Sequence, residues 1–277
     1  MTLWLPDERH FGSVPQDFVL NRDSPQARGL VGYWPLNETG GGISRDLSGN
    51  GDDGVWSGNI IPAISSVGRC VEFDAASHII LPSTIERFTT EATLAVWCKL
   101  RNATPSTASK TGWIKLTECS AINLSCHYPY TDGNGYINTF ASSRHTVTLS
   151  AAVNRTEWHF VCITNTPGAN GWKMYQNNIL VHSATGEADI ALLASEGYLI
   201  GKSNTNAAAN YFFDGWMSEV RLYNRALSAS EVWNHYNPPT RWELKQPRNR
   251  IRYFYVDQAV PPAGGGVSQV IGGGIVA

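Results

Sequence analysis

The stretch Phe212–Val232 reads Phe-Phe-Asp-Gly-Trp-Met-Ser-Glu-Val-Arg-Leu-Tyr-Asn-Arg-Ala-Leu-Ser-Ala-Ser-Glu-Val, and its character changes midway. The first half alternates as a β-strand does, since successive side chains of an extended chain point to opposite faces. One face is expected to carry Trp216, Ser218, Val220, Leu222 and Asn224, and the other Met217, Glu219, Arg221 and Tyr223. In the second half, Ser228 precedes Glu231 by the spacing of a capping box, which predicts a short helix that ends before Pro238.

This order of residues resembles the closing strand of the laminin-G-like, concanavalin A-type jelly rolls. That family pattern is Gly-x-hydrophobic-Asp-Glu-Val-Arg-hydrophobic-Tyr-Asn-Arg-Ala-Leu-Ser-x-x-Glu. Gly215–Glu231 matches it without a gap, with Ser218 in the place of the Asp. Further segments resemble family signatures in family order: Leu30–Glu38, Asp46–Gly54, Cys70–Pro82, Trp158–Thr164 and Trp172–Ser183. The resemblance covers residues 29–236 and implies an all-β, two-sheet antiparallel jelly-roll sandwich.

Short strands between turn signals, with almost no helix, favour the same fold. We expect an N-terminal arm at residues 1–28, the sandwich at 29–239, and at 240–277 a basic, aromatic C-terminal arm with a glycine-rich tail. The first segment has no clear hydrophobic period. It fits an arm that is ordered by another surface and, equally, an extra edge strand laid on the sandwich.

The composition is that of a globular protein, with 42% hydrophobic and 16% charged residues. A formal net charge of −2 gives no reason to expect nucleic-acid binding by the chain as a whole. No apolar run approaches the roughly 20 residues of a membrane span. The first residues also lack the basic leader and apolar region of a signal peptide, so we expect synthesis in a cytoplasm and no membrane partner.

Five cysteines cannot all pair within one chain. Cys98 and Cys162 fall in strand-like runs, which favours buried free thiols. Cys119 and Cys126 lie close enough in the sequence for a local bridge, against which cytoplasmic synthesis argues. No Cys or His spacing suggests zinc.

The loop Asp46–Gly54 has two interpretations. Its glycines can adopt positive φ and its Asp and Asn side chains can bond nearby backbone amides, which favours a plain turn without a cofactor. The alternative is calcium, for which the hard oxygen ligands would be Asp46, Asn50, Asp52 and Asp53. The loop lacks the spacing of an EF-hand and its terminal Glu.

Sandwiches of this type also include glycosidases, in which two carboxylates stand about 5 Å apart on one strand, as Glu-x-Asp-x-(x)-Glu. The nearest match begins at Glu187 and Asp189 but lacks the second Glu. No nucleophile elbow, His-Glu-x-x-His or phosphate loop occurs elsewhere. We therefore expect a protein that is not an enzyme.

The C-terminal arm interleaves basic and aromatic residues, and we expect it to anchor the chain to a partner by docking in an acidic groove or adding a strand. The candidate anchoring residues are Trp242, Arg248, Arg250, Arg252, Tyr253, Phe254 and Tyr255. A nucleic-acid arm is the less favoured alternative. Such tails resemble those that trail laminin-G-like domains in phage and prophage proteins.

These observations favour a structural or interaction protein of a phage virion, as a capsid decoration or tail-associated subunit. Its expected partners are other virion proteins, further copies of itself and host surface glycans. The alternative is a secreted or cell-surface carbohydrate-binding module of a bacterium. Aromatic side chains stack on sugar rings, and the loop-placed candidates are Trp56, Trp113, Tyr128, Tyr130 and Tyr211. For each of these, a core or interface position is the competing interpretation.

Overall fold

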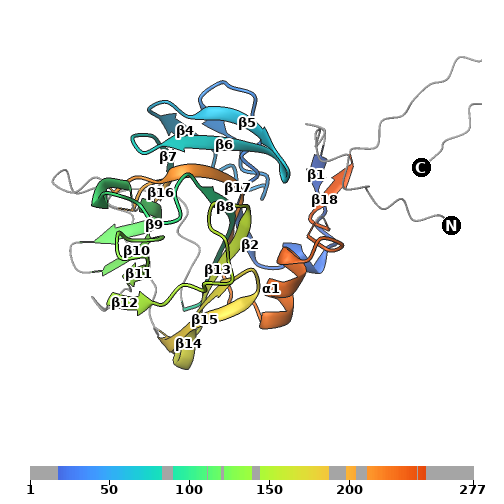
Figure 1. The fold of residues 1–277 in the computed structure, drawn as a ribbon. Coiled ribbons are helices and arrows are strands. Elements are labelled where there is room, and N and C mark those ends of the chain that lie inside the picture. The colour runs from blue at the N-terminus through green and yellow to red at the C-terminus, as the bar shows by residue number, and fades with distance from the viewer. Residues whose placement is uncertain are drawn as a thin grey trace, which may run out of the picture.

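The computed structural model describes residues 18–82, 90–110, 112–119, 122–138, 144–186, 198–203, 211–241 and 243–247. Two antiparallel sheets face each other across a hydrophobic core, as the sequence predicts for a jelly roll (Figure 1).

The first sheet has eight strands, in the spatial order β12 (Arg144–Val147), β11 (Gly135–Asn138), β10 (Ile122–His127), β9 (Gly112–Cys119), β16 (Tyr198–Ile200), β7 (His78–Leu81), β4 (Gly54–Ser57) and β3 (Ile43–Ser44). The second sheet runs β15 (Ile179–Gly186), β14 (Gly168–Gln176), β13 (His159–Asn165), β8 (Ala92–Leu100), β17 (Asp214–Tyr223), β6 (Gly68–Asp74) and β5 (Ile61–Ser65), with β2 (Leu30–Trp34) paired to β17. Strand β17 therefore pairs with β8, β6 and β2, and it is the centre of the second sheet.

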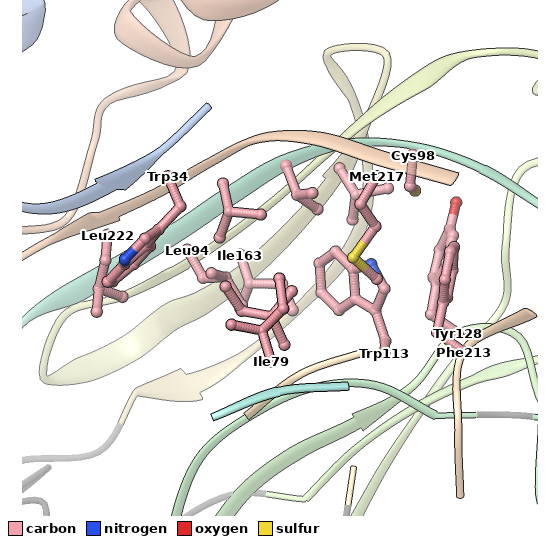
Figure 2. Packing of buried hydrophobic residues seen from close by; sticks show 14 of the residues in the cluster. Trp34, Ile79, Leu94, Cys98, Trp113, Tyr128, Ile163, Phe213, Met217 and Leu222 are labelled. Carbon is pink, nitrogen blue, oxygen red and sulfur yellow. The ribbon is translucent and has the colours of Figure 1, made fainter. Parts of the chain in front are cut away.

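Large side chains fill the space between the sheets. Figure 2 shows Trp34, Trp113, Tyr128 and Phe213 packed with aliphatic residues from both sheets. None of these four side chains is more than 1% exposed. Since large aromatic side chains each bury extensive apolar surface, they contribute strongly to the stability of this core.

A second hydrophobic cluster lies on the outer face of the second sheet, beneath helix α1 (Ala229–Tyr236). Trp97 of β8 stacks on Tyr236 of the helix, with ring centroids 5.9 Å apart. The predicted capping box is confirmed: Ser228 Oγ accepts a hydrogen bond from the Glu231 amide, and the Glu231 carboxylate accepts one from the Ser228 amide. The helix thus starts at a fixed point and covers the middle of the sheet.

Strand β17 contains a β-bulge that the alternating pattern did not reveal. Its pairing with β8 shifts register between Ser218 and Arg221, and Glu219 has a φ of 57°. Beyond the bulge the facing reverses, so Val220 and Leu222 enter the core between the sheets whereas Trp216 faces outward. The prediction that these residues share one face is wrong because the extra residue shifts the period of two.

The two ends of the described chain pair with each other. Strand β1 (Phe18–Leu20) lies antiparallel to β18 (Lys245–Pro247), on the helix side of the sandwich (Figure 1). A short 3₁₀ turn, η2 (Pro25–Ala27), follows β1, and the Gln26 side chain donates hydrogen bonds to the carbonyls of Asn234 and Thr240. A second 3₁₀ turn, η3, spans Ala108–Lys110. We call the β1–β18 pair the terminal ribbon.

Cys70, Cys98 and Cys162 are buried free thiols, which confirms that part of the expectation. The side chains of Cys119 and Cys126 lie outside the described part. None of the helices in the described ranges has the length and apolar character needed to span a membrane.

Candidate functional site

A groove of about 300 Å³ opens on the outer face of the second sheet. The strand order places β5, β6, β17, β8 and β13 side by side, so residues far apart in the sequence meet there. The groove is lined by Ile64, Ser65, Ser66, Lys99, Glu157, Trp158 and Trp216. We call it the two-tryptophan groove.

Trp216 is held in place by the charged residues around it. It stands opposite Glu72 on β6 and Lys99 on β8. The guanidinium of Arg101 lies 4.8 Å from the centre of its ring, and the Lys99 ammonium lies 5.7 Å away. Arg101 is itself fixed, because its Nε donates to Asp214 at 2.7 Å and its Nη2 to Glu72. The indole is therefore oriented by both stacking and an ion network.

Trp158 and Glu157 sit just before β13, where a buried histidine fixes the backbone. His159 Nδ1 donates to the Glu157 carbonyl at 2.9 Å, so its Nε2 accepts the thiol hydrogen of Cys98 at 3.4 Å. Burial lowers the pKa of His159 to about 4, which keeps the ring neutral at neutral pH. The two groove residues thus extend from a rigid element.

The groove combines flat apolar surfaces with hydrogen-bonding groups. The indoles of Trp158 and Trp216 can stack on the apolar face of a ring, while the Lys99 ammonium donates and the Glu157 carboxylate accepts hydrogen bonds. Convergent polar groups beside an aromatic surface are the usual composition of a small-ligand site. Sequence reasoning missed both tryptophans because it assigned them to strand faces. Trp216 lies within β17, and Trp158 directly precedes β13 and packs against the second hydrophobic cluster.

Two of the predicted sugar-stacking residues belong to the core. Trp113 is 0% exposed and Tyr128 is 1% exposed, so neither can meet a ligand at the surface. Trp113 lies within β9 and not in a loop, since the strand begins at Gly112. That part of the expectation is corrected.

The other three predicted aromatics are half-buried. Trp56 packs against the main core, and its Nε1 donates to Ser44 Oγ at 2.8 Å. Tyr130 and Tyr211 are brought together around His127, with ring centroids 5.4 and 4.6 Å from the imidazole. They lie beside β10, in the other sheet from the two-tryptophan groove.

The Asp46 loop is a network of hydrogen bonds within the protein. The Asp46 carboxylate accepts from the amides of Tyr33, Ser48 and Asp52 and from the Ser48 hydroxyl. Asp53 accepts from the Asp46 amide and pairs with Arg45 at 2.6 Å. The Asn50 amide group donates to the Val31 carbonyl at 2.9 Å. Among the described residues, no group of three or more His, Cys, Asp or Glu side chains lies close enough together to hold a metal ion in common. These contacts are those of the plain turn.

The predicted anchoring residues, Trp242, Arg248, Arg250, Arg252, Tyr253, Phe254 and Tyr255, lie outside the described residues, and their role stays a prediction. Lys245 of the terminal ribbon is described, and it belongs to a buried ion network. The Glu219 carboxylate contacts Lys245, Arg221 at 2.9 Å and the Tyr33 hydroxyl at 2.6 Å. Burial opposes the ionisation of Glu219, but the charges of Lys245 and Arg221 outweigh it and lower the pKa to about 2.

Two facing antiparallel sheets in this strand order define a jelly-roll domain. Residues 73–233 match the laminin-G-type family model described as the Concanavalin A-like lectin/glucanases superfamily. This match spans more than half of the chain, and the chain belongs to that family. A comparison with curated proteins finds no match.

Solved structures share the fold at low sequence identity. Domain 4 of AbnA, an extracellular arabinanase from Geobacillus stearothermophilus in complex with arabinotriose, is similar with a TM-score of 0.60 and 20% identity, covering 74% of this chain and 97% of that one. The binding domain of Paraclostridial Mosquitocidal Protein 1 has a TM-score of 0.57 and 15% sequence identity, and the match covers 76% of this chain and 52% of that one. Trypanosoma rangeli sialidase in complex with sialic acid has a TM-score of 0.54 and 16% identity, and the match covers 76% of this chain and 33% of that one.

Proposed function

We propose that this chain is a non-catalytic binding domain that holds a glycan in the two-tryptophan groove. The observation that carries the proposal is the groove itself, in which Trp158 and Trp216 flank Lys99 and Glu157. A sugar ring has apolar C–H faces and hydroxyls at its edge. The indoles would stack on those faces, while the ammonium and carboxylate would bond the hydroxyls.

The structural neighbours support this class of ligand. One was solved in complex with arabinotriose and another in complex with sialic acid, and a third is the binding domain of a toxin. A jelly roll that presents a rigid surface to a carbohydrate or a receptor is therefore a reasonable model for this chain.

Two features support a non-catalytic role. Within the described residues, the groove lining has a single carboxylate, Glu157, whereas retaining hydrolysis needs two about 5 Å apart. Cys98 and His159 form a thiol–imidazole pair, but both are fully buried and burial raises the pKa of the thiol. A nucleophile needs access and a thiolate form. The Glu187–Asp189 segment lies outside the described residues.

A glycan array followed by titration of the best ligand tests the proposal. Trp216→Ala and Trp158→Ala should each weaken binding roughly tenfold, since each removes one stacking surface. Trp233→Ala is the matched control, because Trp233 is 44% exposed on α1 and lies outside the groove lining. Binding that survives both groove substitutions, or that falls equally with Trp233→Ala, would refute the assignment.

We infer further that the domain serves as a subunit of a phage virion, on a capsid or tail, anchored through its terminal segments. The supporting observation is the terminal ribbon, at which residues 1–17 and 248–277 both join the folded body. The groove lies on other elements, so attachment and glycan binding would use separate surfaces. The competing role is a carbohydrate-binding module of a bacterial secreted or cell-surface protein.

Truncation tests this second proposal. The shortened chain should end after Pro247, because Leu244 is 0% exposed and Lys245 pairs with buried Glu219. We expect the full chain to self-associate in sedimentation and the chain ending at Pro247 to remain a monomer with unchanged glycan affinity. Equal assembly of both chains would exclude anchoring by the C-terminal segment.

A further inference from the structure

Two histidines face each other across one edge of the sandwich. Strand β12 ends the first sheet and β15 ends the second, and the two lie at the same side of the molecule (Figure 1). His145 on β12 stands opposite Ile137, and His182 on β15 stands opposite Met174. Ile137 and Met174 both belong to the core between the sheets, so both imidazoles point inward. Their ring centroids are 5.4 Å apart, with planes inclined at 59°.

Neither imidazole has a hydrogen-bond or ion-pair partner in the part of the chain that the structure describes. His182 Nε2 is buried and unpaired. A buried polar atom without a partner is costly, because it has lost its bonds to water. The lone pair of a ring nitrogen without a partner is the group with which an imidazole binds a transition metal.

The spacing of the two rings fits a shared metal ion. Zinc–imidazole bonds are about 2 Å long, and two imidazoles on a tetrahedral ion have their ring centroids about 5 Å apart. We propose that His145 and His182 bind a divalent transition metal, of which Zn²⁺ is the representative, as a bridge between the two sheets. Water completes the coordination, since imidazole nitrogens are typical ligands of zinc, copper and nickel.

Such a bridge would close the edge of the sandwich. The main core is continuous between the sheets, and at this edge Val147 of β12 belongs to it while Val181 and Ala184 of β15 pack against it. The two imidazoles lie between these aliphatic positions, opposite Ile137 and Met174. A metal that binds only the folded chain stabilises it by mass action. The proposal does not depend on glycan binding, because the two-tryptophan groove uses other residues.

Equilibrium dialysis and thermal unfolding of the full chain, made without a polyhistidine tag, test the site with Zn²⁺ alone. We expect one bound Zn²⁺ per chain. With free Zn²⁺ about 100-fold above its Kd, Tm should rise by roughly 5–10 °C. His145→Gln and His182→Gln should each remove both the bound ion and the shift. His145 is partly exposed, so its variant serves even if His182→Gln fails to fold.

His78→Gln is the matched control, because His78 also has a buried, unpaired ring nitrogen but belongs to β7, away from this edge. It should retain the ion and the shift. Absence of bound Zn²⁺ in the natural chain would overturn the proposal. Zn²⁺ that persists in the variant lacking both His145 and His182 would overturn it equally, since binding would then reside elsewhere.

Discussion

The ammonium group of Lys245, on the last described strand, contacts the carboxylate of Glu219 at the bulge of the central strand β17. Each of these side chains is only 7% exposed. Because two buried opposite charges compensate one another, removal of either leaves the other without its partner in a medium of low polarity. This pair joins the terminal ribbon to the strand around which the sheet is organised.

Replacing Lys245 should destabilise the whole domain. Lys245→Met keeps the length of the side chain but leaves Glu219 short of one cation, and we expect a loss of about 3–5 kcal/mol in the free energy of unfolding. Urea denaturation measures it. The control is Arg45→Met, because Arg45 pairs with Asp53 at the surface and is 67% exposed. Its loss should stay below about 1 kcal/mol. Equal losses would mean that the Lys245 pair contributes no more than a surface contact.

The pH dependence of stability should carry the signature of Glu219. Its pKa in the folded chain is about 2, below its ordinary value of 4.5. The stabilisation that ionised Glu219 contributes to the folded state is therefore complete above pH 4.5. It is lost as the pH falls towards 2, because the Glu219 carboxylate takes up a proton at a higher pH in the unfolded chain than in the folded one. Urea midpoints measured across this window should fall less steeply for Glu219→Gln than for the natural chain. Glu243→Gln, at an exposed position, should leave the slope unchanged.

The Asp46 loop should depend on its carboxylate and not on calcium. Asp46→Ala removes the acceptor of four hydrogen bonds, and we expect a loss of several kcal/mol, since each buried donor left unpaired costs about 1–3 kcal/mol. Asp74→Ala should lower the free energy of unfolding by less, because the exposed Asp74 carboxylate accepts one hydrogen bond, from the Ala76 amide. Added Ca²⁺ should leave the Tm of the metal-free natural chain unchanged in a thermal shift assay. A calcium-dependent rise would restore the calcium hypothesis for this loop.

Core and groove tryptophans should separate stability from binding. Trp113→Ala opens a cavity between the sheets and should lower the free energy of unfolding by about 3–5 kcal/mol, with the glycan affinity of the folded fraction unchanged. Trp216→Ala should lower the glycan affinity and leave the free energy of unfolding nearly unchanged, since its ring lines the groove. Paired denaturation and binding measurements on both variants decide the matter. Loss of glycan affinity in folded Trp113→Ala would contradict the assignment of that residue to the core.

The fold was predictable because its signals are local. The closing strand and the Ser228–Glu231 capping box can each be identified within a few residues, and the structure confirms both. The bulge at Glu219 was not predictable, because a positive φ at a non-glycine residue leaves no mark on an alternating pattern. The one extra residue at the bulge therefore reverses the side of the sheet to which each later side chain of β17 points.

The candidate groove was hidden for a different reason. Ser66, Lys99, Trp158 and Trp216 become neighbours only through the strand order of the second sheet, which a single sequence does not specify. The same holds for Lys245, whose partner Glu219 lies 26 residues earlier in the chain. Loop position alone also misled the choice of sugar-stacking residues, since Trp113 and Tyr128 are core residues.

The pairing of Phe18 with Pro247 has a consequence for how this domain can be combined with others. The chain enters the folded body at Phe18 and leaves it at Pro247, and the Cα atoms of such paired residues are only about 5 Å apart. The body between them could therefore be spliced into a surface loop of a host protein without stretching that loop. A short peptide joining the two points would likewise permit circular permutants with new ends elsewhere. Both connections of this domain to any neighbouring domain would therefore leave it from one place on its surface.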